Sequence, residues 1–214
     1  MGSATMAAPL STITETRKMQ REIRGGLPAE IRADDSSVKV TGYAAVFNQE
    51  ADIGGYFREI IHPGAFRAAI GRDDVSFLIN HAGLPLARTR SGTLILAEDD
   101  HGLRIESALD NSDPDVARIV PKMKRGDLDK MSFAFRATRQ EWDETSEIPI
   151  RHVYELDLFD VSIVTDPAYD GTEIGLRSLE KHREQQRKAH NFHAASARLR
   201  MKMNLALKER ENGK

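Results

Sequence analysis

The sequence predicts an α+β fold, mostly β, in which an antiparallel β-barrel is flanked by helices. Three observations favour this fold class. Short runs of alternating apolar and polar residues recur along the body of the chain, which is typical of strands with one buried face. Only one strong helix signature interrupts these runs, and helices and strands do not alternate as a parallel sheet requires. A small barrel is the most economical way to bury so many short strands.

The composition is that of a globular protein and excludes several classes. The chain has 214 residues, of which 40% are hydrophobic and 30% charged, enough for one domain with a sizeable core. Cysteine is absent, which excludes disulfides, Cys-based zinc sites and thiol nucleophiles. No apolar run approaches the length of a membrane-spanning helix, and residues 1–20 lack the apolar core of a secretory signal. We therefore expect a soluble, intracellular protein.

Charge is unevenly distributed along the chain. Leu176 to Lys214 carries eleven basic and four acidic side chains, a net charge of +7. The rest of the chain carries twenty basic and twenty-nine acidic side chains, a net charge of −9. An acidic body with a basic tail indicates that the tail interacts with something else.

The N-terminal elements are a leader, a hairpin and a short helix. Residues 1–26 are small and polar, and we expect a flexible leader with a short helix at Thr14–Ile23. Ala29–Arg32 and Val38–Phe47 alternate in polarity on either side of a polar turn, which predicts a hairpin. Ala65–Ile70 is predicted to form one or two helical turns.

The remaining strands follow from the same alternation. Val75–Ile79 predicts a short buried strand. Thr93–Ala97 and Leu103–Ala108 flank a turn rich in Asp and Gly, which predicts a second hairpin. The last strands are Met131–Thr138 and Ile150–Val164, and the length of the second predicts a bend within it.

Two helices have clear signatures. Asp113 as N-cap, Pro114 at the first position and Gly126 beyond the end delimit a helix. Pro121 should kink or shorten it. Between Leu176 and Asn212 no Gly or Pro interrupts the chain, which predicts a long charged helix. Its apolar residues recur at three- and four-residue steps: Phe192, Ala195, Leu199, Met203 and Ala206.

Several kinds of site are absent from the sequence. No glycine-rich phosphate loop and no HExxH zinc motif occurs, and the seven histidines lack ligand spacing. The body also lacks a basic patch interleaved with aromatic residues. We therefore expect no cofactor, no metal and no specific nucleic-acid partner.

His81 is the first candidate for chemistry. It follows an apolar strand and precedes Ala82–Pro85, a segment that must turn. A histidine at such a junction can lie in a cleft, where its pKa suits a general base. A hydrogen-bonded structural histidine explains the same pattern.

Ser132 and Asp160 are possible partners for it. In the strand around Ser132, bulky side chains share one face, which leaves an open surface around the hydroxyl where a substrate carbonyl fits. A serine on a solvated strand face is the alternative.

Asp160 needs a cationic or hydrogen-bonding partner if it is buried, and either an imidazole or an arginine would serve. Asp157 and His152 are rivals for the same role. Alternation places Asp160 on one face with Leu156, Leu158, Ser162 and Val164.

A series of short motifs follows in a fixed order along the chain. The motifs are Gly42–Asn48, Gly55–Glu59, His62–Phe66, Leu78–His81, Pro85–Thr89, Ser91–Leu94, Arg125–Leu128, Met131–Phe135, Leu158–Ser162 and Pro167–Tyr169. In this order they resemble the phage prohead proteases of the HK97 type. The resemblance covers about Pro28 to Arg177.

The resemblance implies a fold, an activity and a site. Members of this family are similar to the herpesvirus maturation proteases, with an antiparallel barrel surrounded by helices. They are serine endopeptidases that cut the scaffolding segment from the major capsid protein, and then themselves, inside the prohead. The family's histidine falls on His81 and its serine on Ser132. An acidic residue falls on Asp160, where many relatives carry Glu, and His152 stays open because the herpesvirus enzymes use a second histidine. Loop 82–92 with Arg88 is a candidate for oxyanion binding.

The resemblance also defines the expected organisation. Together with the composition and the charge distribution, it predicts a leader at 1–26, a prohead protease domain at 27–177 and a basic helical tail at 178–214. It further implies a homodimer without cofactor in the host cytoplasm, inside the assembling procapsid. The tail is interpreted as a docking helix, a segment removed by self-cleavage, a solvated extension or a non-specific nucleic-acid contact.

A non-cleaving capsid-assembly factor on the same fold is the main alternative function, and an esterase is a weaker one because the GxSxG elbow is missing.

Overall fold

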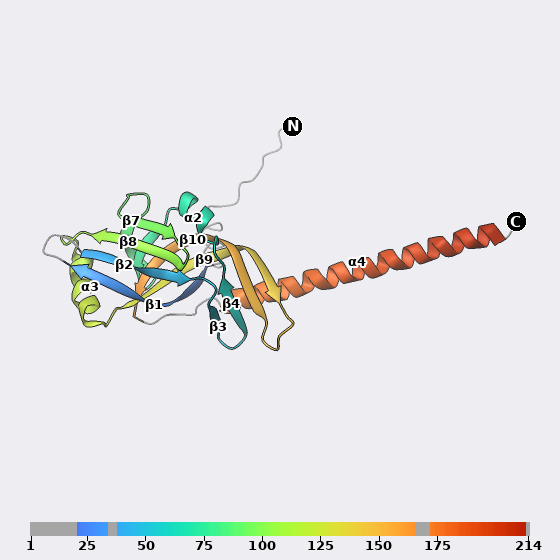
Figure 1. Ribbon diagram of the computed structural model, residues 1–214, viewed down its shortest axis with the longest axis horizontal. Helices are drawn as coiled ribbons and strands as arrows, with labels where there is room; N and C mark the ends of the chain where they lie inside the picture. Colours follow the sequence, from blue (N-terminus) through green and yellow to red (C-terminus); the bar gives the residue numbers. More distant parts are fainter. Residues whose placement is uncertain (1–20, 34–37, 166–171, 213–214) are drawn as a thin grey trace, which may run out of the picture. The chain divides into compact units, whose positions relative to one another are not determined.

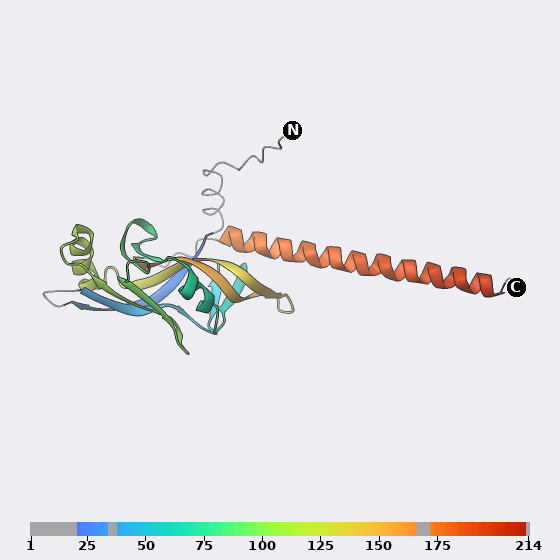
Figure 2. The same cartoon turned by 90° about the horizontal axis from the view of Figure 1, so that it is seen from above.

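The computed structural model describes residues 21–33, 38–165 and 172–212, and Figures 1 and 2 show their elements. The strands are β1 (Glu22–Ala33), β2 (Val38–Val46), β3 (Glu50–Ile53), β4 (Phe57–Ile61), β5 (Ser76–Ile79), β6 (Ala82–Arg88), β7 (Leu94–Glu98), β8 (Gly102–Leu109), β9 (Lys130–Asp143) and β10 (Ile150–Val164). The helices within the described ranges are α2 (Arg67–Arg72), α3 (Pro114–Arg125) and α4 (Thr172–Asn212). The fold is therefore mixed α+β and mostly β.

The ten strands form one sheet. Its order is β3-β4-β10-β9-β1-β2-β8-β7, with β5 and β6 joined to it through β10. The predicted hairpins are confirmed, since β1 pairs with β2 and β7 pairs with β8, both antiparallel. The path of strands ends at β3 and at β7, and no closed barrel is found in the parts of the chain that the structure describes. In both views α3 lies at the opposite end of the sheet from β3 and β4 (Figures 1 and 2).

β10 pairs with three other strands, and two of them are parallel partners on one edge. Its first residues, Ile150–Val153, pair with β4, and Asp160–Ile163 pair with β5. Its other edge pairs with β9 along almost its whole length. Because β5 runs parallel to the end of β10, the residues that follow β5 emerge beside Ser162, and His81 is one of them.

The expected bend in β10 is confirmed, and it consists of β-bulges. The register with β9 shifts between Val153 and Leu156 and again between Leu158 and Asp160. Each shift exchanges the two faces of the strand, since side chains alternate with period two. The side chains of β10 that point into the hydrophobic core are therefore Val153 before the first shift, Leu156 and Leu158 between the shifts, and Val161 and Ile163 after the second. The prediction that Asp160 shares a face with Leu156 and Leu158 is wrong, because the second bulge separates them.

The first strand begins earlier than the sequence indicates. The strand expected from Ala29 starts at Glu22, so Glu22–Pro28 pairs with β9, and only Ala29–Ala33 pairs with β2. Ile23, expected in a helix, lies in this strand. Residues 1–20 of the expected leader, the turn at 34–37 and the motif at 167–169 lie outside the described residues.

The helix signature in the body is confirmed. The Asp113 side chain accepts a hydrogen bond from Asp115 N at 2.8 Å, and Gly126 ends the helix with a φ of 80°. This left-handed conformation is one that glycine adopts at little cost. Pro121 lies inside the helix without shortening it, because α3 continues to Arg125.

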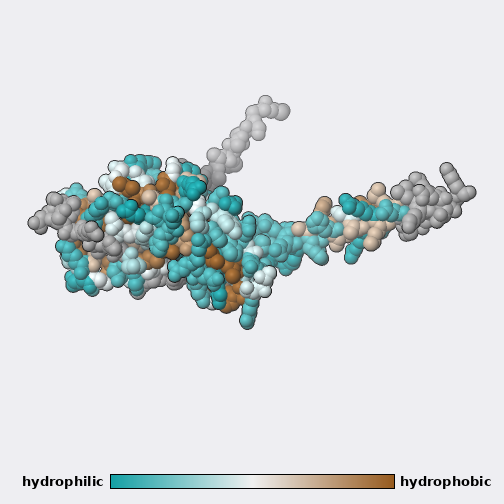
Figure 3. All heavy atoms as spheres, viewed as in Figure 1, coloured by the Kyte–Doolittle hydropathy of each residue, from teal (hydrophilic) through white to brown (hydrophobic). Residues whose placement is uncertain are grey.

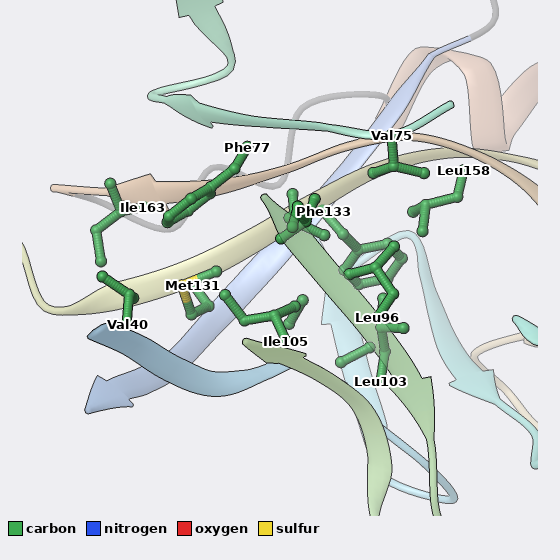
Figure 4. Packing of buried hydrophobic residues seen from close by; sticks show 14 of the residues in the cluster. Val40, Val75, Phe77, Leu96, Leu103, Ile105, Met131, Phe133, Leu158 and Ile163 are labelled. Carbon is green, nitrogen blue, oxygen red and sulfur yellow. The ribbon is translucent and has the colours of Figure 1, made fainter. Parts of the chain in front are cut away.

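The core lies beneath β9 and β10 and brings together residues distant in sequence. Met131, Phe133 and Phe135 all point into it from β9, as their alternation predicts. Figure 4 shows Met131 and Phe133 packed with side chains of β5, β8 and β10, among them Phe77, Ile105 and Ile163. Full burial of side chains of this size contributes about 1.5–3 kcal/mol each, so the core fixes the position of β9 and of what projects from its other face.

Residues 175–214 form a compact unit separate from residues 1–174. Most of this unit belongs to α4, which confirms the expected long helix. Its large apolar side chains Phe192, Leu199, Met201 and Met203 are exposed, and apolar residues are visible in this stretch in Figure 3. Among the described residues, no helix is both long enough and apolar enough to span a bilayer.

Candidate active site

His81 leaves the end of β5 in an uncommon backbone conformation. Asn80 and His81 have φ angles of 49° and 56°, in the left-handed region. Such residues cost on the order of 1–3 kcal/mol each and persist only where the surroundings hold them. Here Asn80 N donates to Ile163 O at 3.0 Å, and Asn80 Oδ1 accepts from Thr165 N at 3.1 Å. His81 N donates to Ser162 Oγ at 3.2 Å. The end of β10 therefore fixes the direction of the imidazole.

The imidazole of His81 lies between Ser132 and Asp160. Nε2 is 2.7 Å from Ser132 Oγ, and Nδ1 is 2.6 Å from Asp160 Oδ1. Because a carboxylate can only accept, Nδ1–H donates to Asp160 and Nε2 is left as the acceptor for the serine hydroxyl. This is the order of groups that activates a serine as a nucleophile. The structure thus brings together all three residues that the sequence singled out.

Asp160 is buried but both of its oxygens have polar partners. Oδ1 accepts from Ser162 Oγ at 2.9 Å as well as from His81, and Oδ2 forms an ion pair with Arg21. A buried carboxylate is tolerated only with such compensation. These contacts hold the carboxylate in line with the imidazole.

The electrostatic surroundings keep His81 neutral. Burial, and after it the positive charge of Arg21, lower the pKa of His81 to about 4. Burial likewise lowers the pKa of the Arg21 guanidinium. A histidine that is neutral near pH 7 can accept the proton of Ser132 as a general base.

The prediction that the surface around Ser132 is open is wrong. Ser132 has 0% of its surface exposed, because the first residues of β1 lie along β9 at this point. Gly25 is paired with Ser132, and a Cβ on Gly25 would lie 2.6 Å from that of the serine. Ser132 Oγ also lies 2.8 Å from the carbonyl oxygen of Arg24. The single hydroxyl proton therefore has two acceptors, Arg24 O and His81 Nε2.

The rival residues lie in other environments. His152 Nδ1 is 2.9 Å from His62 Nε2, and Asp157 pairs with Arg72 and Arg136. Neither has a contact with His81 among those of the described residues. Burial, and after it the charge of His152, lower the pKa of His62.

Arg88, the candidate for oxyanion binding, is also engaged elsewhere. Its Nε donates to Asp74 Oδ1 at 2.9 Å, and its NH2 group lies 2.9 Å from Oδ2 of the same carboxylate. The Arg88 guanidinium is thus held at the surface by Asp74.

Sequence reasoning missed three residues of the site. Ser162 stands two positions after Asp160 on a strand, and this spacing alone places the two side chains on one face. Gly25 and Arg21 had no such signal, because both fell within the small, polar residues of the expected leader. Their roles depend on the pairing of β1 with β9, which joins residues more than a hundred positions apart.

Comparison with known proteins identifies the family of the chain. Residues 28–186 match the family described as Caudovirus prohead serine protease. The chain belongs to this family. The chain is 29% identical over 156 residues to the prohead protease of Enterobacteria phage HK97. This alignment covers 66% of the chain and 64% of that relative. Among solved structures, this prohead protease family member is similar to the capsid assembly protease of bacteriophage T4, with a TM-score of 0.46 and 12% identity, over 69% of this chain and 98% of that one.

Proposed function

We propose that the chain is a serine endopeptidase of phage capsid maturation. It cleaves the scaffolding segment of the major capsid protein, and itself, inside the prohead. The observation that carries this proposal is the hydrogen-bonded series Ser132–His81–Asp160, with contacts of 2.7 Å and 2.6 Å, in a member of the prohead protease family.

The chemistry is acyl transfer in two halves. His81 takes the hydroxyl proton as Ser132 Oγ attacks a peptide carbonyl carbon, and it returns that proton to the leaving amine as the C–N bond breaks. Water then hydrolyses the acyl-enzyme, with His81 again acting as base. Asp160 and Ser162 are positioning residues, since they keep Nδ1–H of the imidazole directed away from the nucleophile.

The rest of the expected organisation belongs to the same proposal. The partners are the major capsid protein with its scaffolding segment and a second copy of the chain as a homodimer, and the enzyme works in the host cytoplasm inside the assembling procapsid. The herpesvirus-like barrel, the flexible leader, the domain at 27–177 and the docking role of the basic tail at 178–214 stay predictions. Of the leader expected at 1–26, however, residues 22–26 lie in β1.

The proposal is tested by co-expression of the full chain with its major capsid protein. The wild type is compared with Ser132→Ala and with Ser107→Ala, and the capsid protein is analysed by intact mass. Ser107 is a matched control because it is also a buried strand serine, and its hydroxyl donates to Thr93 O outside the site. We expect a shortened capsid protein with the wild type and with Ser107→Ala, and a full-length one with Ser132→Ala.

Two other outcomes separate the alternatives. Full-length capsid protein in assembled shells with every variant would replace the peptidase by the non-cleaving assembly factor. Equal shortening with Ser132→Ala and the wild type would assign the cleavage to another protein.

A further inference from the structure

The first residues of β1 form an extended segment that is paired with β9 at the position of Ser132. Glu22, Arg24 and Gly25 pair antiparallel with Phe135, Phe133 and Ser132 of β9. This is strand addition to the edge of a sheet, a common way in which proteins bind extended peptides. Since β9 carries the nucleophile, a peptide bound in this way passes directly over it.

One peptide group of this segment lies at the nucleophile. The carbonyl oxygen of Arg24 is 2.8 Å from Ser132 Oγ, and the following residue is Gly25, whose missing side chain permits the close approach. The bond that this register presents to Ser132 is the one between Arg24 and Gly25. The side chain before that bond is basic, and the one two positions earlier, Glu22, is acidic.

Both of these side chains meet opposite charges that the body of the protein provides. Arg24 Nε donates to Glu59 Oε1 at 2.7 Å, and its NH2 group donates to Glu59 Oε2 at 3.2 Å. Arg151 holds Glu22 through two hydrogen bonds, of 2.5 Å and 2.9 Å. All four residues are buried, and two-point contacts of this kind between a guanidinium and a carboxylate are strongly directional.

The two body residues form a balanced pair by themselves. Arg151 NH1 also donates to Glu59 Oε2 at 2.9 Å, and Arg151 Nε donates to Gln140 Oε1 at 2.6 Å. If the segment left, Glu59 and Arg151 would still neutralise one another. A cavity of about 280 Å³ opens beside Arg24 and Glu59, so the arginine side chain lies at the edge of a pocket rather than in a sealed core.

The segment is joined to the rest of β1 by an irregular point. The register with β9 shifts between Gly25 and Leu27, and Gly26 has a φ of 122°, which residues with a side chain rarely adopt. Pairing with β2 involves only residues from Ala29 onward. The residues before Gly25 can therefore leave without breaking the β1–β2 hairpin.

We propose that Glu59 and Arg151 are specificity-determining residues of the peptidase, and that the chain's own first substrate is the Arg24–Gly25 bond. Glu59 selects a basic side chain just before the cut bond, and Arg151 selects an acidic side chain two positions earlier. Ser132 Oγ forms an ester with the Arg24 carbonyl, Gly25 nitrogen leaves with the proton from His81, and water releases the Arg24 carboxylate. This inference rests on the proposed peptidase function and adds to it the class of peptide that the site accepts.

The test uses the full chain co-expressed with its capsid protein. The chain is analysed by intact mass and N-terminal sequencing. We expect a Ser132-dependent product that begins at Gly25. Arg24→Ala should slow its appearance at least tenfold, because Glu59 then meets no basic side chain in the segment that is cut, and Arg24→Lys should restore it to within a fewfold.

A second set of variants examines the body of the protein. Glu59→Gln should slow cutting after Arg24 at least tenfold, whereas Glu155→Gln, the same change at an exposed carboxylate of β10, should leave the rate unchanged. Thermal melting of each Glu59 variant is measured in the Ser132→Ala background. Because Glu59→Gln can itself unfold the protein, the decision rests on the Arg24 variants, which alter only the segment that is cut.

The outcomes for the two proposals are distinguishable. A capsid protein that is shortened by the wild type only, together with a chain that stays uncut or is cut elsewhere, overturns this inference and leaves the peptidase intact. Unchanged cutting in Arg24→Ala overturns it as well. If neither protein is cut although Ser132 is present, the proposed function itself fails.

Discussion

The hydroxyl of Ser162 donates to Oδ1 of Asp160 at 2.9 Å, and the same oxygen accepts the hydrogen bond from Nδ1 of His81. Ser162 further accepts the backbone N–H of His81 at 3.2 Å. Ser162 thus orients both Asp160 and His81, and Asp160 in turn orients the imidazole of His81.

Removal of this hydroxyl should weaken catalysis without abolishing it. A hydrogen bond to a charged group contributes about 1.5–3 kcal/mol, so we expect Ser162→Ala to lower kcat about 10- to 100-fold with a smaller change in KM. Peptide-cleavage kinetics measure this. Ser107→Ala, which removes a buried hydroxyl outside the site, should leave kcat within a fewfold, and equal losses in the two variants would speak against the positioning role.

The carboxylate of Asp160 should matter far more than that of Asp157. Asp160→Asn keeps the shape but removes the charge that fixes the tautomer of His81, and we expect a loss of about 10³- to 10⁴-fold in kcat. Asp157→Asn disturbs only the contacts with Arg72 and Arg136, and its kcat should stay within a fewfold of the wild type. A larger effect at Asp157 would contradict the assignment. Single-turnover cleavage is the appropriate measurement.

Protonation of His81 should require acid. Because burial and Arg21 lower its pKa to about 4, the imidazole is neutral above that value, and the base is lost only as the pH falls through about 4. Arg21→Gln removes the smaller cause, so the midpoint should rise while staying below the usual value of 6.5. NMR titration of the imidazole in the Ser132→Ala background measures both. A midpoint that Arg21→Gln leaves unchanged would rule out this electrostatic contact.

The same titration should affect stability. The pKa of His81 is lower in the folded state than in the unfolded chain, so the unfolded chain binds the proton first. The contribution of His81 to stability is therefore complete above about pH 6.5 and falls as the pH drops from there toward 4. Urea denaturation at several pH values checks the sign, and His81→Gln should flatten this part of the curve.

A methyl group on Gly25 should uncover the nucleophile. In Gly25→Ala the new Cβ would lie 2.6 Å from Ser132 Cβ and 2.6 Å from Met131 O, so the segment must move away from β9. We expect faster labelling of Ser132 by a fluorophosphonate probe than in the wild type. Gly71→Ala, where a Cβ meets no atom within 4 Å, serves as the matched control and should label at the wild-type rate.

The core residue Phe77 supports both the fold and the site. It is fully buried on β5, the strand that leads to His81, and Phe77→Ala should cost about 3–5 kcal/mol in the free energy of unfolding. Leu84→Ala, at a residue that is 78% exposed, should cost less than about 0.5 kcal/mol. Guanidinium denaturation compares the two, and a small loss at Phe77 would contradict the packing in Figure 4.

Local signals in the sequence were sufficient for most elements, and the resemblance to a family singled out three residues that the structure brings together. The cap at Asp113, the hairpins and the strand before His81 all depend on neighbouring residues, and motif order pointed to Ser132 and Asp160. What the sequence could not indicate depends on pairing across long distances. The register of Glu22–Pro28 against β9 determines that Ser132 is covered, and no residue near Ser132 carries that information.

The bulge between Leu158 and Asp160 determines which way the carboxylate faces. Phe159 is the extra residue at this point, because Leu158 pairs with Phe135 and Asp160 pairs with the next residue of β9, Ala134. If the same residues formed a regular strand without the bulge, period-two alternation would turn Asp160 toward the hydrocarbon interior and present Val161 to the imidazole. This one backbone irregularity is therefore itself an element of the site's chemistry.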